Sequence, residues 1–534
     1  MDSLTASVFS CRSPLEIAMT MLRTGLTFVL LVAFAVSARP LRAQSSTIQV
    51  TVDAQAPVHP FPHFWEESFG SGHAVLALRD NYRRDLKEVH DQAGMRFVRF
   101  HGIFDDENGV YSEDAQGNSV YNWSYIDQIY DGLLVNGVRP FVEIGFMPRA
   151  LAARPDVHAF WYKPIVSPPK DYAKWDAFIG AFARHLIERY GIGEISQWYF
   201  EVWNEPNLDF WTGEPKQSTY FDLYDHTARA LKAVSSRIRV GGPATSSAHW
   251  IPEFLGHISQ ANVPIDFIST HGYADDTVED LFGTHEEIPM HDRVCRAVGH
   301  VHEQIRASSL PDLPLMWTEW NVPSYGDMHA RDNWYVGPAL ARTISQCDGK
   351  VTMISYWTFD DVFEEDGVVE EPFNGGFGLI TEDRIKKPAF YDFSLLHQLG
   401  EERLANTAEN LLVTRRKDGT LVVAAWNLID MDQLAQGTPL TMRLSFKGIP
   451  AGAALTIQRV DRAHGNPLSV YRSMGNPVSP TEAQIAALNR ASALPAAEHH
   501  QLIDSVLEIT LPPNGLALIT IPPQGNMSKG TRHE

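Results

Sequence analysis

Two glutamates, Glu205 and Glu319, lie at the ends of two apolar stretches of this 534-residue chain. Glu205 follows a run of β-forming residues in QWYFEVWNEP, and Glu319 lies near the end of LPLMWTEWN. Pro206 cannot donate a hydrogen bond to a sheet and disfavours a helical residue before it. We therefore expect a strand to end here, with Glu205 extended at its carboxyl end. Two carboxyl groups held together can serve as a general acid and as a nucleophile or base.

The chemistry that such a pair fits best is hydrolysis of a glycosidic bond, which needs one protonated and one ionised carboxyl group. Glu205 suits the acid, because aromatic neighbours exclude water and thereby raise the pKa of a carboxyl group. Glu319 then suits the nucleophile, and Asn204 can donate a hydrogen bond to a substrate hydroxyl. Carboxyl groups about 5–5.5 Å apart predict retention of configuration, and a gap of about 6.5–9.5 Å predicts inversion.

Strands that alternate with helices must position the two glutamates. Eight apolar strands in this rhythm fit one (β/α)8 TIM barrel, an α/β fold whose active site forms at the C-terminal strand ends. Glu205 and Glu319 fall there, on strands four and seven. An open doubly wound sheet is the alternative, but no glycine-rich dinucleotide motif follows a strand. The predicted strands are His63–Phe69, Phe97–Gly102, Arg139–Phe146, Gln197–Glu205, Arg239–Ala244, Asp266–Tyr273, Leu313–Asn321 and Thr352–Phe359.

The chain after Leu399 changes to short alternating strands between Gly, Pro and Asp turns, which indicates an accessory β-sandwich domain. Thr481–Ser492 is predicted to form a helical insertion in it. The predicted helices of the barrel are Asp80–Ala93, Ile126–Asn136, Asp171–Tyr190, Tyr220–Arg237, Val294–Ser308 and Pro338–Cys347. The predicted organisation is a signal peptide (1–43), an N-terminal strand joining the sandwich (44–60), the catalytic barrel (61–399), the sandwich (400–524) and a disordered tail (525–534).

Composition excludes some partners. A net charge of −21 argues against nucleic acid and anionic membranes, which reward basic patches. The three cysteines have no metal-ligand spacing, and whether Cys295 pairs with Cys347 is left open. Leu26–Val36 is a short apolar run typical of a secretory signal, so we expect an exported protein, periplasmic or secreted. An uncleaved N-terminal anchor is the alternative, and self-association into a homo-oligomer stays open.

Several segments together resemble one enzyme family. They are HGIFDDENGVYSED, YNWSYIDQIYDGLLVNGVRPFVEIGFMP, PPKDYAKWDAFI, FEVWNEPNLDFW, RVGGPA, VPIDFISTHGY, TEWN, SYWTFDDVFEE and GGFGLI, followed in the predicted sandwich by RVDRAHGNP and MGNPVSPTEAQIAAL. The chain resembles glycoside hydrolase family 39, and within it the β-xylosidase branch more than α-L-iduronidase. The resemblance implies a retaining exo-glycosidase that hydrolyses terminal β-D-xylosyl residues from xylo-oligosaccharides, with Glu205 as acid/base and Glu319 as nucleophile.

The resemblance also implies the residues that contact the sugar. His271 and Tyr273 lie two apart at a strand end and so face one side, where the tyrosine can hold the nucleophile carboxylate. Trp357 can form the floor beneath the sugar ring. Neither a metal nor a cofactor is needed for this chemistry. The implied substrate-binding residues are His101, Phe146, Asn204, Phe210, His271, Tyr273, Trp357 and Glu364.

Two departures from the xylosidase pattern bear on the sugar. Trp320 follows the predicted nucleophile where Tyr or Phe is more usual. The segment after it is one residue longer than in the xylosidases, so Tyr325 is offset by one residue from their pocket tyrosine. We expect both to border the sugar, so an α-L-arabinosyl, β-galactosyl or α-L-iduronosyl substrate is an alternative. A non-catalytic carbohydrate-binding protein on the same scaffold is a further one, although a pure binder has no use for a paired acid and nucleophile.

Overall fold

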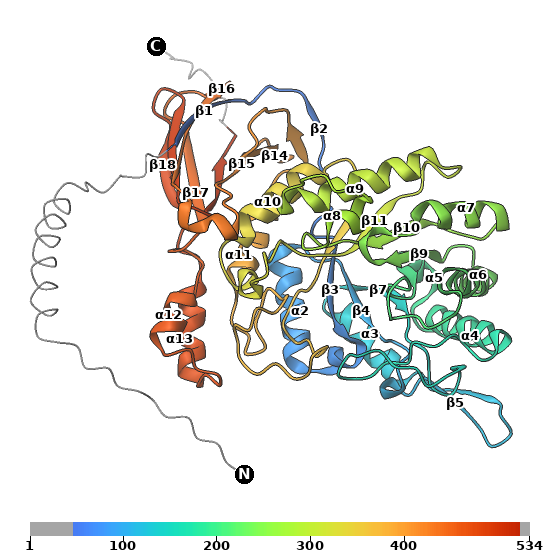
Figure 1. Cartoon of the computed structure of the whole chain (residues 1–534). Coiled ribbons are helices and arrows are strands. Elements are labelled where there is room, and N and C mark those ends of the chain that lie inside the picture. Colours follow the sequence, from blue (N-terminus) through green and yellow to red (C-terminus); the bar gives the residue numbers. More distant parts are fainter. Residues whose placement is uncertain (1–45, 524–534) are drawn as a thin grey trace, which may run out of the picture. The chain divides into compact units, whose positions relative to one another are not determined.

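Figure 1 shows the computed structural model of the chain, which describes residues 46–523. The predicted signal peptide and the predicted C-terminal tail lie outside the described residues. Within residues 46–523, no helix combines the length and the apolar character needed to cross a membrane.

Eight parallel strands close into a barrel, which confirms the predicted TIM-barrel fold. The barrel closes where Ser355 and Tyr356 pair with Ser68 and Phe69. The strand after which Glu205 lies is fourth in the barrel, and the strand that carries Glu319 is seventh. In chain order the strands are β3 (Ser68–His73), β4 (Phe97–His101), β7 (Arg139–Ile144), β8 (Tyr199–Val202), β9 (Arg239–Thr245), β10 (Phe267–His271), β11 (Leu315–Trp320) and β12 (Met353–Tyr356).

The helices of the barrel follow the predicted rhythm with two additions. No helix is predicted between β9 and β10 or directly after β12, yet α7 and α11 form there. Both begin with proline in their first turn, where its missing N–H costs nothing. The long helices are α2 (Asp80–Ala93), α3 (Ser124–Val135), α4 (Tyr172–Tyr190), α6 (Lys216–Val234), α7 (Ile251–Ala261), α9 (Met290–Ala307), α10 (Val336–Cys347) and α11 (Pro388–Leu396), with short α5 (Ile192–Ile195) and α8 (Val278–Phe282).

The prediction for the first strand is wrong. The expected strand at His63–Phe69 begins only at Ser68, because the chain before it makes tight turns. Phe64 N–H donates to the Pro62 carbonyl at 2.8 Å, and Glu66 N–H donates to the His63 carbonyl at 3.2 Å. Phe64 is buried in the hydrophobic core from a turn rather than from a strand.

The barrel interior is layered, and this layering positions the site. Its N-terminal end is filled by an apolar cluster, drawn from five strands and comprising Phe97, Phe141, Phe267, Met316 and Met353 with Tyr199 beside them. Because every second residue of a strand points inward, the residues two positions further along face the next layer. That layer is charged and holds Arg99, Glu143 and Glu201, all fully buried. The two candidate catalytic glutamates lie above this charged layer, at the C-terminal ends of the strands.

Two antiparallel sheets form the additional domain. Alternating apolar residues of both sheets share one core, which includes Val52, Leu444, Ile509, Val423 and Ile519, as expected of a sandwich. The smaller sheet has the order β1 (Ser46–Asp53), β16 (Leu440–Lys447) and β19 (Val506–Leu511). The larger has the order β18 (Glu498–Gln501), β17 (Ala454–Val460), β20 (Leu516–Ile521), β15 (Leu421–Trp426), β14 (Leu411–Arg415), β13 (Glu402–Leu404) and β2 (Val58–Pro60).

Smaller elements complete the fold. A β-hairpin follows β4, and two helices lie between β17 and β18. The second of these helices corresponds to the predicted insertion and is capped by Thr481 in a capping box. These elements are β5 (Tyr111–Glu113), β6 (Ser119–Tyr121), α12 (Leu468–Ser473) and α13 (Glu482–Ser492).

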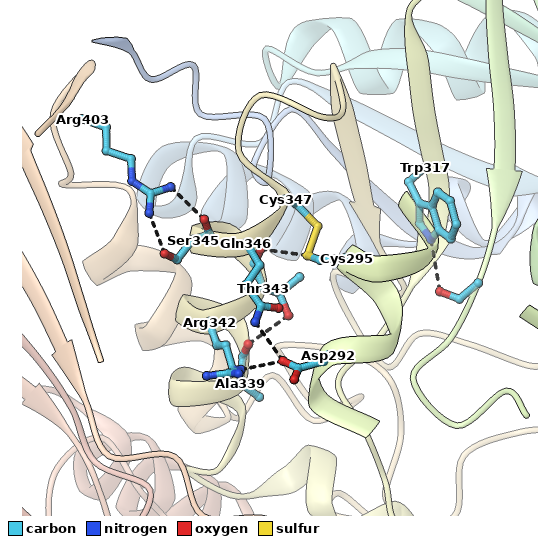
Figure 2. The surroundings of a disulfide bond; sticks show 11 residues. Asp292, Cys295, Trp317, Ala339, Arg342, Thr343, Ser345, Gln346, Cys347 and Arg403 are labelled. Atoms are coloured by element: carbon cyan, nitrogen blue, oxygen red, sulfur yellow. Dashed lines mark hydrogen bonds and ion pairs between the residues drawn. A yellow bond between two sulfur atoms is a disulfide. The ribbon is translucent and has the colours of Figure 1, made fainter. Parts of the chain in front are cut away.

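A disulfide joins Cys295 of α9 to Cys347 of α10, which answers the question of pairing that the sequence leaves open. Figure 2 shows this bond with the polar contacts around it. Asp292 on α9 accepts hydrogen bonds of 2.8 Å from Arg342 and from Gln346 on α10. The disulfide and these contacts tie together two neighbouring helices outside the barrel strands.

We predict that the variant Cys295→Ala/Cys347→Ala loses about 2–4 kcal/mol of unfolding free energy, because the bond closes a loop across 52 residues. The hydrolytic activity expected of the glutamate pair should be unchanged, since the bond joins outer helices. Denaturant titration with and without a reducing agent checks this. The reducing agent should shift the wild-type midpoint to that of the variant and leave the variant itself unmoved. A wild-type midpoint that ignores reduction would contradict the prediction.

Candidate active site

The backbone at Glu205 differs from the prediction. Glu205 is not extended before Pro206 but has a φ of 40°, in the left-handed region. One tertiary and one turn hydrogen bond override the preference set by Pro206: Glu205 N–H donates to the Ala244 carbonyl, and Leu208 N–H donates to the Glu205 carbonyl, each at 2.9 Å. Such a conformation costs on the order of 1–3 kcal/mol in a non-glycine residue and is typical of functional sites. It turns the Glu205 carboxyl group towards His271, whose Nδ1 lies 3.0 Å from Oε1.

The Glu319 carboxylate is held from two sides. Arg99 Nη1 donates to Oε1 at 2.7 Å, and the Tyr273 hydroxyl donates to Oε2 at 2.8 Å. The hydrogen bond from Tyr273 is the contact that its spacing from His271 suggests. Both bonds stabilise the ionised form of Glu319 and fix its orientation.

The two glutamates are close neighbours. One carboxyl oxygen of Glu205, one of Glu319 and one ring nitrogen of His271 all lie within 4.8 Å of one another. His271 Nδ1 is 3.0 Å from Glu205 and 3.5 Å from Glu319, so the imidazole lies between the two carboxyl groups. A separation of at most 4.8 Å between these oxygens agrees with the short spacing of retaining glycosidases, roughly 5–5.5 Å, and excludes the roughly 6.5–9.5 Å of inverting ones.

Arg99 is the centre of the charged layer below the glutamates. In addition to Glu319, its guanidinium donates to Glu201 at 2.6 Å and to Asn204 at 2.9 Å, and it pairs with Glu143 at 3.0 Å. The side chains of Arg99, Glu143 and Glu201 are completely buried. The sequence prediction missed all three. Their signal was an ionisable residue in the middle of an otherwise apolar strand, which is rare unless the residue is paired.

Burial gives the two glutamates and His271 unusual proton affinities. Loss of water raises the pKa of Glu205 to about 7, so this carboxyl group keeps a proton near neutral pH. Burial also raises the pKa of Glu319, and the Arg99 guanidinium opposes that rise. Burial lowers the pKa of His271 to about 4, so its imidazole is neutral between them. The Arg99 and Tyr273 hydrogen bonds therefore favour ionised Glu319 beside protonated Glu205.

His101 forms one wall beside the pair. Its Nδ1 lies 2.7 Å from Glu143 and its Nε2 lies 3.5 Å from Glu365. Burial alone would lower the pKa of His101, but Glu143 and the nearby carboxylates raise it to about 10. His101 is thus a cation that carries two N–H donors at neutral pH. Among the described residues, Glu143 Oε1 and His271 Nε2 are buried polar atoms without a hydrogen-bond partner.

Three predicted aromatic residues surround His101. The Trp357, Phe146 and Phe210 rings lie 4.9, 5.9 and 6.4 Å from the imidazole. Trp357 also has the Arg99 guanidinium 5.8 Å from its ring centre, so it lies beside the charged layer as a floor would. All three rings are buried.

The loop after β12 carries Glu364, which is predicted to contact the sugar, and its neighbour Glu365. Glu364 is engaged with Arg79, whose Nη2 lies 2.6 Å from its carboxylate, and lies 3.8 Å from His73. Glu365, which the sequence prediction did not name, is the one that reaches His101. Neighbouring positions on a loop cannot be told apart by strand alternation, which explains the missed residue.

The two departures from the xylosidase pattern do not line the glutamate pair. Trp320 follows Glu319 in β11 and therefore faces the opposite side of the strand. It is buried against Tyr356, with ring centres 5.5 Å apart. Tyr325 packs against Tyr335 at the start of α10, with ring centres 6.3 Å apart. The expectation that Trp320 borders the sugar is therefore wrong, because it belongs to the packing between strands and helices.

Two groups of described residues have a spacing that metals accept. In Glu205, His271 and Glu319, the Arg99 cation already bonds Glu319, and this positive charge opposes a metal ion. In His63, Glu66 and His397, each imidazole Nδ1 already hydrogen-bonds one oxygen of Glu66, at 3.0 and 2.9 Å. Protein partners satisfy the ligand atoms in both groups.

A TIM barrel with paired glutamates after its fourth strand and on its seventh defines the class of protein as a glycoside hydrolase. The chain belongs to glycosyl hydrolases family 39, whose model matches residues 48–503. The family expected from the sequence motifs is therefore confirmed.

Named relatives cover nearly the whole chain. The β-xylosidase of Geobacillus stearothermophilus is 39% identical over 477 residues, which span 86% of this chain and 93% of that protein. The β-xylosidase of Caldicellulosiruptor saccharolyticus is 36% identical and covers 84% of this chain and 92% of its own. Among solved structures, a monomeric β-xylosidase from Caulobacter crescentus CB15 superposes with a TM-score of 0.81 at 33% identity, covering 90% of this chain and all of that one.

We predict that Arg99→Met destabilises the fold by about 3–5 kcal/mol, because it leaves buried carboxylates without their cation. Arg96→Met is the matched control, since Arg96 pairs with Glu67 at the surface and such pairs contribute at most about 1 kcal/mol. Denaturant unfolding of both variants provides the comparison. Equal losses in the two variants would contradict the central role of Arg99.

Proposed function

We propose that the chain is a retaining exo-β-xylosidase that releases terminal β-D-xylosyl residues from xylo-oligosaccharides. The observation that carries the proposal is the pair of carboxyl oxygens within 4.8 Å in opposite hydrogen-bond environments. Glu319 accepts hydrogen bonds from Arg99 and Tyr273, whereas Glu205 is hydrogen-bonded to neutral His271 and to Ser246 and has a raised pKa. One carboxyl group is thus prepared to attack and the other to donate a proton.

The first step transfers the sugar to the enzyme. Ionised Glu319 attacks the anomeric carbon, the bond to the leaving oxygen breaks, and Glu205 gives that oxygen its proton. The product is a covalent glycosyl-enzyme with inverted configuration. In this proposal Trp357 forms the floor beneath the sugar ring, beside His101.

The second step releases the sugar. Glu205, now ionised, takes a proton from a water molecule, and that oxygen attacks the anomeric carbon as Glu319 leaves. The second inversion restores the original configuration. Glu205 regains its proton, and both glutamates return to their starting state.

The identity of the sugar rests on the relatives and on the charges of the site. The two relatives at 36–39% identity are both named β-xylosidase. An α-L-iduronosyl substrate needs a cation for its carboxylate. The two cations described beside the glutamate pair already have acidic partners: Arg99 is engaged by Glu143, Glu201 and Glu319, and His101 by Glu143 and Glu365. A neutral pentose therefore fits this site better than a uronic acid.

We also propose export of the protein, with residues 61–399 as the catalytic part and the sandwich as an accessory domain. The apolar run Leu26–Val36 resembles a secretory signal. The disulfide between Cys295 and Cys347 supports an oxidising compartment, where such bonds persist.

We predict that Glu319→Ala loses on the order of 10⁴-fold or more in kcat on a 4-nitrophenyl β-xyloside, as expected when a covalent nucleophile is removed. Azide should rescue Glu319→Ala and yield α-xylosyl azide, because it attacks in place of the carboxylate. Azide should rescue Glu205→Ala and yield β-xylosyl azide, because it attacks the glycosyl-enzyme. Product configuration is read by NMR.

Glu402 is an exposed glutamate of the accessory domain, and Glu402→Ala is the matched control. It should keep full activity, and azide should not change its rate or its product. Near-normal hydrolysis by Glu319→Ala would contradict the proposed function. An α-azide product from Glu205→Ala would reverse the two assigned roles.

A further inference from the structure

An exposed tryptophan lies in the loop between β7 and α4 at the C-terminal end of the barrel. Trp161 is 55% exposed, although large aromatic side chains are usually buried. Among the described residues, its indole has no aromatic partner and no side-chain hydrogen bond. Tryptophan is enriched among residues that anchor binding partners, because its ring offers a large rigid apolar surface.

The backbone of Trp161 is held firmly. The loop folds back on itself through the antiparallel bridge between Val157 and Ile165, and Lys163 N–H donates to the Phe160 carbonyl at 2.9 Å. Trp161 lies in the turn that this hydrogen bond closes. Its own N–H donates to the Glu365 carbonyl at 2.7 Å, which ties the turn to the loop after β12. The backbone from which the indole projects is therefore fixed, so less of the loop has to be ordered when a ligand binds.

The turn is anchored directly against the candidate active site. Phe160 packs against Phe210 at 5.2 Å and against His101 at 6.0 Å, and Tyr162 stacks on His73 at 4.0 Å. The residues on both sides of Trp161 thus contact aromatic side chains at the barrel mouth. Phe210 belongs to the same loop as Glu205, the proposed proton donor to the leaving oxygen.

Glu365 connects Trp161 to the reacting groups from the other side. Its carbonyl holds the Trp161 backbone, while its carboxylate lies 3.5 Å from His101 Nε2. Gly367 follows in the same loop and lies close to the indole, since a Cβ placed on it would be 3.7 Å from Trp161 Cδ1. The turn that carries the exposed indole thus contacts two loops of the site. One is the loop that carries Glu205, and the other is the loop that carries Glu365.

We propose that Trp161 is the stacking platform for the sugar ring of the leaving group, an inference that rests on the proposed glycosidase function. A xylopyranose ring is uncharged and presents C–H bonds on its faces, which pack on an aromatic ring. The same platform binds an acceptor sugar during transfer. The acceptor O4–H then attacks the anomeric carbon, the bond to Glu319 breaks, and Glu205 takes the acceptor proton.

Reactivation of a trapped glycosyl-enzyme tests the platform separately from the two glutamates. The full chain is treated with 2,4-dinitrophenyl 2-deoxy-2-fluoro-β-xyloside, excess reagent is removed, and activity returns either in buffer alone or with added xylobiose. Return in buffer needs only water, whereas the xylobiose-dependent rate needs a bound acceptor. Trp161→Ala should lose roughly tenfold in the xylobiose-dependent rate constant, a loss typical of removing an aromatic anchor.

Two further variants control for structure and for the ring itself. Trp161→Phe should recover most of the acceptor-dependent rate, because it restores an aromatic face. Tyr125→Ala removes another exposed aromatic ring, on helix α3, and should behave as wild type. The rate in buffer alone should be the same in all variants.

Wild-type xylobiose reactivation in Trp161→Ala would overturn the inference. An equal loss in buffer and in xylobiose would also overturn it, because this would reveal a structural role. Failure of the unaltered chain to form a trapped xylosyl-enzyme would contradict the proposed function and this inference with it. Mass spectrometry of the intact protein distinguishes that result from a defect in acceptor binding alone.

Discussion

The buried guanidinium of Arg99 is the interaction on which the active site depends. It lies inside the barrel without access to water and contacts Glu143, Glu201, Glu319 and Asn204 at 2.6–3.0 Å. A cation there is stable only because carboxylates surround it, and they are stable only because of the cation. The apolar layer at the N-terminal end of the barrel closes this network off from solvent on that side.

This network separates the protonation states of two glutamates in one site. Glu319 accepts hydrogen bonds from Arg99 and Tyr273, whereas the His101 and Arg99 cations oppose the rise in the pKa of Glu205 without outweighing its burial. Burial then raises the pKa of Glu205 to about 7. The left-handed backbone of Glu205 is part of the same arrangement, because an extended residue before Pro206 would direct the carboxyl group elsewhere. Different environments thus give similar side chains different roles.

Much of this architecture could be predicted from the sequence, because the strand–helix rhythm of a TIM barrel is a local property. The positions of Glu205 after strand four and of Glu319 on strand seven follow from that rhythm. The charged layer was missed, because Arg99 lies within an apolar strand and only the closed barrel shows which residues face inward. The backbone of Glu205 was mispredicted, because hydrogen bonds to Ala244 and Leu208 outweigh the preference set by Pro206. The closed barrel accounts for the first failure, and a tertiary bond to Ala244 together with a turn bond from Leu208 accounts for the second.

The pH dependence of kcat/KM for two substrates is the most direct test of the separated protonation states. Xylobiose needs a protonated Glu205 to expel its leaving sugar. The dinitrophenolate of 2,4-dinitrophenyl β-xyloside, in contrast, is expelled without protonation. We expect kcat/KM for xylobiose to fall as pH rises through about 7, because the active protonated form of Glu205 is lost. The value for the dinitrophenyl substrate should stay level over the same range. A xylobiose profile that stays level well above pH 7, or the same decline for both substrates, would contradict the account.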